Sequence, residues 1–166
     1  MKVWVAKAIT GVVIAAALSV PAIAQGLVTQ RNISLAMAQT IAQAALAQCE
    51  SMGFKVSVAV VDRGGLAIVM LRGDGAGLHT PEGAERKAYT ARTFSQPSAD
   101  FVKRMTDRPD TVGSVHYNRV LALAGGLPIK AGNETIGGVG VSGAPGGEKD
   151  EVCANAGIAK VEAALK

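Results

Sequence analysis

The chain has 166 residues, a length that suits one domain with a buried core. Hydrophobic residues make up 49% of it, aromatic residues 4% and charged residues 18%, and this composition excludes an intrinsically disordered chain. The formal net charge is only +4, and no stripe of lysine and arginine with interleaved aromatic residues occurs, so we expect no nucleic-acid partner.

The first 24 residues have the pattern of a bacterial signal peptide. Lys2 and Lys7 supply the positive charge, residues 8–20 form the apolar stretch, and a small-x-small cleavage site ends at Ala24. An uncleaved membrane anchor is the alternative, but the apolar run is short for a spanning helix, which needs ~20 residues. We therefore expect residues 1–24 to be removed and residues 25–166 to form a single domain in the periplasm or outside the cell, with no membrane partner after cleavage.

The remaining chain opens with a helix and two strands. The helix is expected over residues 33–52, with Asn32 as its N-cap. β-Branched residues then predict a strand over residues 56–61, and a tight turn leads into a second apolar run over residues 66–71. That second run has the continuous apolar pattern of a strand buried on both faces.

A Gly-rich loop and a second helix follow. The helix is expected from Pro81 to about Phe94, with Thr80 as its N-cap. The later elements are predicted in this order: a helical turn over residues 98–105, a loop over 106–117, and a stretch over 119–124 that suits either strand or helix. Strands over 125–130 and 135–142 and a helix over 148–165 follow. Tight turns join neighbouring strands, so we expect a largely antiparallel sheet with helices on its faces.

Two histidines are the candidate nitrogen ligands. With only His79 and His116 present, a histidine-rich zinc site is excluded, but a single ligand to a metal or cofactor is not. A lone histidine in a loop is more often simply solvated. His79 is the better candidate because it lies at the mouth of the Gly-rich loop, beside Thr80 at the start of a helix.

The first turn of the second helix carries two acidic residues. Glu82 and Glu85 lie three apart and therefore share a helix face, a spacing that suits a hard or borderline metal ion such as iron. The alternative is that both simply complement the helix dipole. Arg86, Lys87, Tyr89 and Arg92 follow on the same helix, where they either bind acidic groups of a ligand or form its solvated face.

Cys49 and Cys153 form an even pair in a chain that we expect to be exported, which favours a disulfide. Neither has a histidine nearby in sequence, so a catalytic thiol is the poorer interpretation. The bridge would join the first helix to the last and contribute ~4 kcal/mol in the chain-entropy model. It requires the two helices to cross near these turns, and the sequence leaves open whether they do.

Several longer strings resemble the GlcG/HbpS family: VAVVDRGG, ERKAYTARTF, GGLPIKAGNETIGGVGVSGAPGGEKDE and CANAGIAKVEAAL. The likeness covers Ile33 to Leu165 and implies an α/β/α sandwich around a mainly antiparallel sheet of about five strands, related to profilin-like folds. It also implies a homo-oligomer, from dimer up to octamer, and some members bind haem or iron. Glu82 and Glu85 match the Glu-x-x-Glu pattern that looks iron-binding in these members, whereas the axial haem ligand varies among them.

These observations together predict an exported small-ligand-binding protein, with haem or iron as the leading ligand. We expect His79, Thr80, Arg86 and Tyr89 to bind the cofactor and the two glutamates to bind the metal. The alternatives are an enzyme of small-molecule metabolism, acting in haem breakdown or on a 2-hydroxy acid, and a subunit with only an assembly role. Binding is favoured because the sequence shows no convincing acid or base beside His79.

Overall fold

The computed structural model describes Met1 and residues 26–166, so the expected signal peptide lies outside the described residues apart from Met1. The regular elements, in chain order, are α1 (Leu35–Ser51), β1 (Ser57–Val61), β2 (Ala67–Arg72), α2 (Thr80–Phe94), α3 (Ser98–Asp107), the 3₁₀ segment η1 (Pro109–His116), β3 (Gly126–Ala131), β4 (Glu134–Ser142), α4 (Gly147–Ala159) and the 3₁₀ segment η2 (Glu162–Ala164). None of the helices in the described part is both long and apolar enough to cross a membrane.

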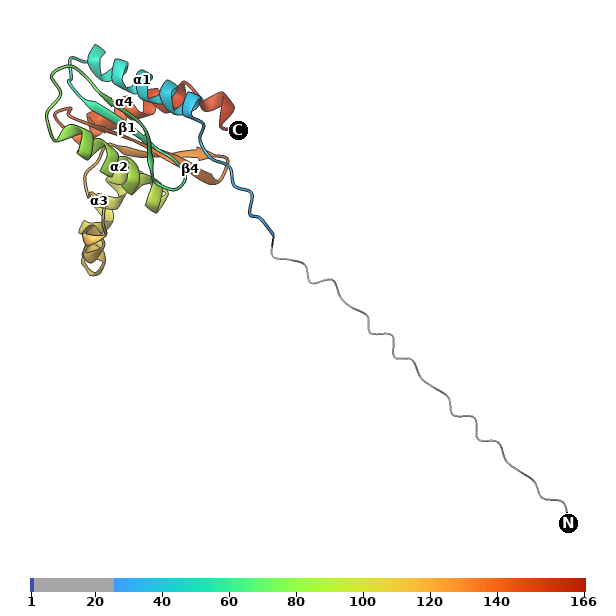
Figure 1. Cartoon of the computed structure of the whole chain (residues 1–166). Coiled ribbons are helices and arrows are strands. Elements are labelled where there is room, and N and C mark those ends of the chain that lie inside the picture. Colours follow the sequence, from blue (N-terminus) through green and yellow to red (C-terminus); the bar gives the residue numbers. More distant parts are fainter. Residues whose placement is uncertain (2–25) are drawn as a thin grey trace.

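The strands form one antiparallel sheet in the order β2-β1-β4-β3. Helices α1 and α4 pack together on one face, and α2 covers the other face with α3 beside it, which gives three layers (Figure 1). The predicted helix–sheet–helix arrangement is therefore confirmed. Within the described residues the expected number of about five strands is corrected to four, because residues 119–124 form neither strand nor helix and two hairpins build the sheet.

Strand β2 is less buried than its sequence predicts. Its six residues are all either exposed or half-buried, whereas all five residues of β1 are buried. The difference arises from position in the sheet: β2 lies at an edge and has only β1 as a neighbour, while β1 lies between β2 and β4. A continuous apolar run therefore marked an edge strand here and not a strand buried on both faces.

The Gly-rich strand β4 lets helix α2 lie directly on the sheet. A Cβ atom added at Gly140 would lie 2.1 Å from the carbonyl oxygen of Ala84, and one at Gly138 would lie 2.5 Å from that of Ala88. Such distances leave no room for any side chain. The glycines thus set how closely α2 approaches β4, and they fix the position of the residues at the start of α2.

A disulfide joins Cys49 of α1 to Cys153 of α4, with the two Cα atoms 5.4 Å apart. The two helices run antiparallel, since Gly157, one turn further along α4, packs against Ile41, two turns earlier in α1. Antiparallel neighbours bring the C-terminal part of one helix beside the N-terminal part of the other. No special crossing of the helices is needed, contrary to the expectation from sequence, and both cysteines are fully buried.

Helix α1 begins two residues later than expected. Ser34, not Asn32, is its N-cap, and the Ser34 hydroxyl accepts a hydrogen bond from the Met37 amide. The Asn32 side chain instead accepts hydrogen bonds of 2.9 Å from its neighbour Ile33 and from Arg63 in the β1–β2 turn. Asn32 therefore ties the segment before α1 to the sheet.

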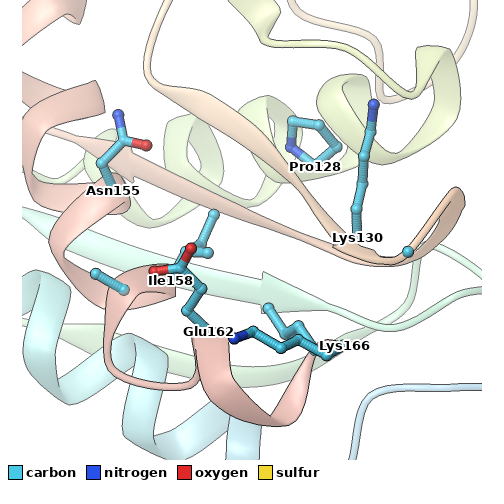
Figure 2. A pocket seen from close by; sticks show the side chains of 9 residues that line it. Pro128, Lys130, Asn155, Ile158, Glu162 and Lys166 are labelled. Carbon is cyan, nitrogen blue, oxygen red and sulfur yellow. The ribbon is translucent and has the colours of Figure 1, made fainter.

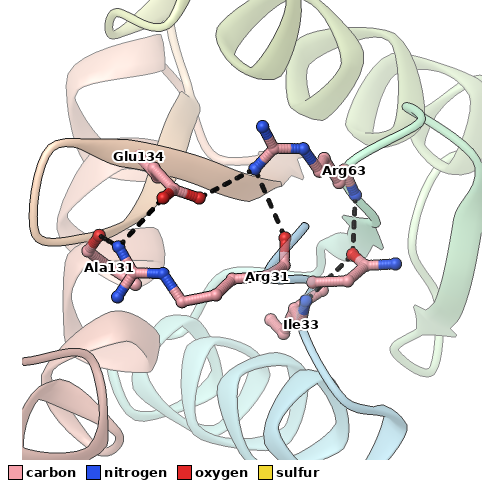
Figure 3. A network of polar contacts seen from close by, with 6 residues as sticks. Arg31, Ile33, Arg63, Ala131 and Glu134 are labelled. Atoms are coloured by element: carbon pink, nitrogen blue, oxygen red, sulfur yellow. Dashed lines mark hydrogen bonds and ion pairs between the residues drawn. The ribbon is translucent and has the colours of Figure 1, made fainter. Parts of the chain in front are cut away.

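An arginine–glutamate network completes this attachment (Figure 3). Glu134, at the start of β4, lies 3.4 Å from an Arg31 nitrogen and 3.2 Å from an Arg63 nitrogen, and Arg31 also donates to the carbonyl of Ala131. The hydrogen bond from Arg31, together with the positive charges of both arginines, lowers the pKa of Glu134 below its usual value. The network joins the segment before α1 to the turns of both hairpins.

The last helix is shorter than predicted. It ends at Ala159 and gives way to η2, where the expectation was a helix through residue 165. Leu165 is still buried in the core, and its carbonyl accepts a hydrogen bond from Gly132 in the β3–β4 turn.

Candidate functional site

The start of α2 carries the two residues expected to contact a cofactor. His79 is the N-cap position and its side chain is exposed, while Thr80 is the first helical residue and is buried. Thr80 is therefore not the N-cap, contrary to prediction. Its hydroxyl donates to the carbonyl of Gly77 at 2.8 Å and lies 2.8 Å from the buried Ser57 hydroxyl, so it anchors the Gly-rich loop to β1.

Two adjoining hollows meet at His79 and Gly143. The first, which we call the glycine hollow, has a volume of about 410 Å³ and is also lined by Gly53, Phe54, Lys55, Gly75, Gly77 and Thr80. The second, which we call the lysine hollow, has a volume of about 300 Å³ and is also lined by Lys87, Leu123, Ala124, Ser142, Ala144, Gly147 and Asp150. The exposed imidazole of His79 thus lies between a glycine-rich hollow and a smaller hollow that contains charged groups.

A buried ion pair forms part of the lysine hollow. The Lys87 ammonium lies 2.7 Å from Asp150 Oδ2 and donates to the Val141 carbonyl at 3.0 Å, and the two side chains are only 5% and 3% exposed. Asp150 Oδ1 accepts from the Ala144 amide at 3.1 Å. Burial raises the pKa of Asp150 above its ordinary value, against the opposing effects of Lys87 and of the Ala144 hydrogen bond.

Sequence reasoning missed this pair. The sequence pattern assigns Lys87 to a helix face that is solvated or binds a ligand, and it gives Asp150 no role. The helical period held a usable signal, because Lys87 lies seven residues after Thr80 and therefore on the same stripe as the buried Ala84 and Ala91. A lysine on a buried stripe requires a partner, and the sequence alone does not show that α4 supplies it.

The two predicted metal ligands lie in a separate hollow. Glu82, Glu85 and Arg86 line a space of about 420 Å³ together with residues 115–119, which include His116 and Tyr117. Glu82 pairs with Arg86 at 3.2 Å, and Glu85 pairs with Arg119 at 2.7 Å. We call this space the arginine hollow, because each carboxylate faces an arginine.

The remaining predicted residues, Arg86 and Tyr89, take part in arginine contacts. Arg86 donates to the Val120 carbonyl at 2.8 Å, and Arg119 lies over the Tyr89 ring at 4.3 Å from its centre. Tyr89 is thus packed beneath an arginine and lines neither hollow at His79.

The six predicted site residues therefore do not form one site. His79 and Thr80 line the glycine hollow, whereas Glu82, Glu85 and Arg86 line the arginine hollow. Among the residues that the structure describes, no group of three or more His, Cys, Asp or Glu side chains is placed to hold a metal ion.

Another hollow, of about 510 Å³ and thus larger than the three described above, lies between β3 and the C-terminal end of the chain. Figure 2 shows Lys130 of β3 on one side and Asn155, Ile158 and Glu162 on the other. It contains no histidine and none of the residues predicted for a site.

The fold and sequence match known proteins over most of the chain. A family model described as haem degrading protein HbpS-like matches residues 33–159. The crystal structure of HbpS has a TM-score of 0.78 at 42% identity and covers 81% of this chain and 94% of its own. A Streptomyces reticuli HbpS variant, in which two glutamates three positions apart are changed to aspartate, has a TM-score of 0.78 at 40% identity and covers 86% of this chain and 97% of its own.

A more distant structure is a complex of PduOC with haem. It has a TM-score of 0.69 at 26% identity and covers 76% of this chain and 93% of its own. The resemblance noted from sequence is confirmed by these matches. Because the family model spans most of the chain and the HbpS structures share its fold, this protein belongs to the HbpS-like family.

Proposed function

We propose that this protein binds haem at the start of α2, with the His79 imidazole as axial ligand. The observation that carries the proposal is the position of His79, an exposed imidazole at the junction of two hollows. Imidazole is a common axial ligand of haem iron. The PduOC complex with haem, a structure of the same fold, adds support from a relative.

The glycine hollow has the walls that a flat ring requires. Four of its residues, Gly53, Gly75, Gly77 and Gly143, have no side chain to hold a macrocycle away from the backbone. Phe54 offers an apolar surface and Lys55 a positive charge for a propionate. Its volume of about 410 Å³ lies within the range usual for cofactor pockets, ~300–1,000 Å³.

Titrating hemin into the purified protein tests this proposal. A haem held by a protein imidazole shows a Soret band that differs from that of free hemin, so we expect a saturable change with one hemin per chain. The same titration with a protein lacking a haem site, such as lysozyme, is the control. A hemin spectrum that stays unchanged at micromolar protein would contradict the proposal.

We further propose iron as a second ligand, bound by Glu82 and Glu85. Both carboxylates line the arginine hollow, and carboxylate oxygens suit a hard ion such as ferric iron. In the HbpS variant, two glutamates with the same spacing were changed to aspartate, and this supports the choice of Glu82 and Glu85 as candidate ligands. Since Arg86 and Arg119 hold the carboxylates, iron has to displace these arginines before it binds.

Changing Glu82 and Glu85 together to glutamine should abolish iron binding and leave the fold intact, because both side chains lie at the surface in half-exposed ion pairs. Equilibrium dialysis with ferric citrate measures the binding, and circular dichroism checks the fold. The matched control changes Glu50 and Glu162, two glutamates outside the arginine hollow. If the Glu82→Gln, Glu85→Gln protein binds iron as tightly as the wild type does, the iron site is contradicted, and the two glutamates serve only to complement the helix dipole.

We also propose that the protein is exported and begins at Gln25 after cleavage. The charged, apolar and small-residue segments before Gln25 support this proposal. The disulfide also supports it, because disulfides form and persist mainly in oxidising compartments. The intact mass of the protein recovered from a periplasmic extract shows at which residue the chain begins. A mass that includes residues 1–24 would contradict cleavage.

A further inference from the structure

The unused hydrogen-bonding groups of the lysine hollow are donors. Lys87 gives two of its three N–H bonds to Asp150 and Val141, which leaves one. The Ser142 hydroxyl is almost fully buried and has no hydrogen-bond partner within residues 26–166. The exposed imidazole of His79 adds a third group that can donate.

The one carboxylate in the same hollow is already occupied. Asp150 Oδ2 accepts from Lys87, and Oδ1 accepts from the Ala144 amide. Its charge is balanced by that of Lys87 at 2.7 Å. Ser142 and His79 can donate as well as accept, but the remaining N–H of Lys87 can only donate, so a ligand that satisfies this buried ammonium must bring an acceptor oxygen.

The position of α4 favours a negative charge in this space. Gly147, the first residue of this 13-residue helix, lines the hollow, and amide groups at a helix N-terminus attract anions, among them already the acidic side chains of Glu148 and Asp150 in the same turn. Leu123, Ala124 and Ala144 provide apolar wall beside the donors. With a volume of about 300 Å³, the hollow is smaller than the glycine hollow.

We propose that the lysine hollow is a carboxylate subsite, in which Lys87 and Ser142 hold the carboxylate of a ligand beside the start of α4. The carboxylate comes either from a free short-chain acid or from a haem propionate. The second source rests on the proposed function, and its geometry is favourable because the two hollows share His79 and Gly143.

Titration of the haem-free protein with sodium propionate tests the subsite without haem. We expect saturable shifts of backbone amide resonances around Gly147, and binding roughly tenfold or more weaker for propionamide, which has the same shape without the charge. Ser142→Ala should weaken propionate binding about tenfold, since one hydrogen bond to a charged group is lost while the Lys87–Asp150 pair stays intact. Ser51→Ala, which changes the last residue of α1 and no residue that lines the lysine hollow, is the matched control and should bind as the wild type does.

The haem arm identifies the source of the carboxylate. If a propionate occupies the hollow, hemin dimethyl ester should bind the wild type roughly tenfold more weakly than hemin, and excess sodium propionate should compete with hemin. If a free acid occupies it, propionate should bind equally well with and without hemin. Both results support the subsite. Equal binding of propionate and propionamide, with no effect of Ser142→Ala, would overturn it, and failure of hemin alone to bind would contradict only the proposed function.

Discussion

Replacing Lys87 with methionine is expected to lower the free energy of unfolding by about 3–5 kcal/mol, the usual cost of removing one partner of a buried ion pair. The change leaves the Asp150 carboxylate, with a 3% exposed side chain, without its charged partner. It also leaves the Val141 carbonyl without its Lys87 donor. Urea unfolding at pH 7, followed by circular dichroism, measures the loss.

A double variant separates the ion pair from simple packing. Lys87→Met with Asp150→Leu removes both charges at once, and we expect it to be within about 1–2 kcal/mol of the wild type, because a buried pair often contributes little net stability. If the double variant loses as much as the sum of the two single variants, the pair is not coupled as the structure indicates.

The pH dependence of the single variant follows from the Asp150 pKa. Burial already raises this pKa, and removing Lys87 takes away an opposing effect and raises it further. A raised pKa means that the native state binds the proton more tightly than the unfolded chain does. The contribution of Asp150 to stability is thus greatest below its unfolded pKa of about 3.9 and falls as the pH rises toward the native pKa. The deficit of Lys87→Met relative to wild type should shrink as the pH is lowered to about 4.

The second large effect concerns the disulfide. Cys49 and Cys153 are 104 residues apart, and the chain-entropy model gives a bridge over a loop of about 100 residues a contribution of ~4–5 kcal/mol. Changing both cysteines to alanine is expected to lower the free energy of unfolding by up to this amount, because the unfolded chain gains freedom and two core side chains become smaller. Chemical unfolding of the oxidised protein and of the double variant gives the difference.

Reduction of the wild type provides the control, since it breaks the bridge without changing side-chain volume. Reduced wild type and the alanine variant should differ from oxidised protein in the same direction. Alkylation of unreduced protein from the periplasm should find no free thiol, because the bridge is closed and buried. Two alkylated cysteines in that sample would contradict both the bridge and the proposed export.

Much of the fold could be predicted from local patterns. The strand predicted over residues 135–142 is β4 (Glu134–Ser142), and its glycines at 138 and 140 are where α2 lies directly on the sheet. The burial of β2 could not be predicted, because an apolar run shows the composition of a strand and not its place in the sheet. The starts of α1 and α2 moved by one or two residues, since Asn32 and Thr80 form hydrogen bonds to distant parts of the chain and do not cap their helices.

The candidate site was harder to predict, because it depends on which helix faces meet. Glu82 and His79 are three residues apart in the sequence, yet they line different hollows. The sequence showed no acid or base near His79, but the fold brings Lys87 from α2 and Asp150 from α4 to the same hollow. Contacts between segments 63 residues apart cannot be derived from spacing along a single helix.

The chain has only two histidines, and the structure places them in different hollows, so a paired hemin titration tests the account most directly. His79→Ala removes the imidazole between the glycine and lysine hollows, and His116→Ala removes the one in the arginine hollow. We expect His79→Ala to weaken hemin binding roughly tenfold or more and to alter the Soret band, while His116→Ala binds as the wild type does. Loss of binding in His116→Ala, with His79→Ala unchanged, would contradict the account.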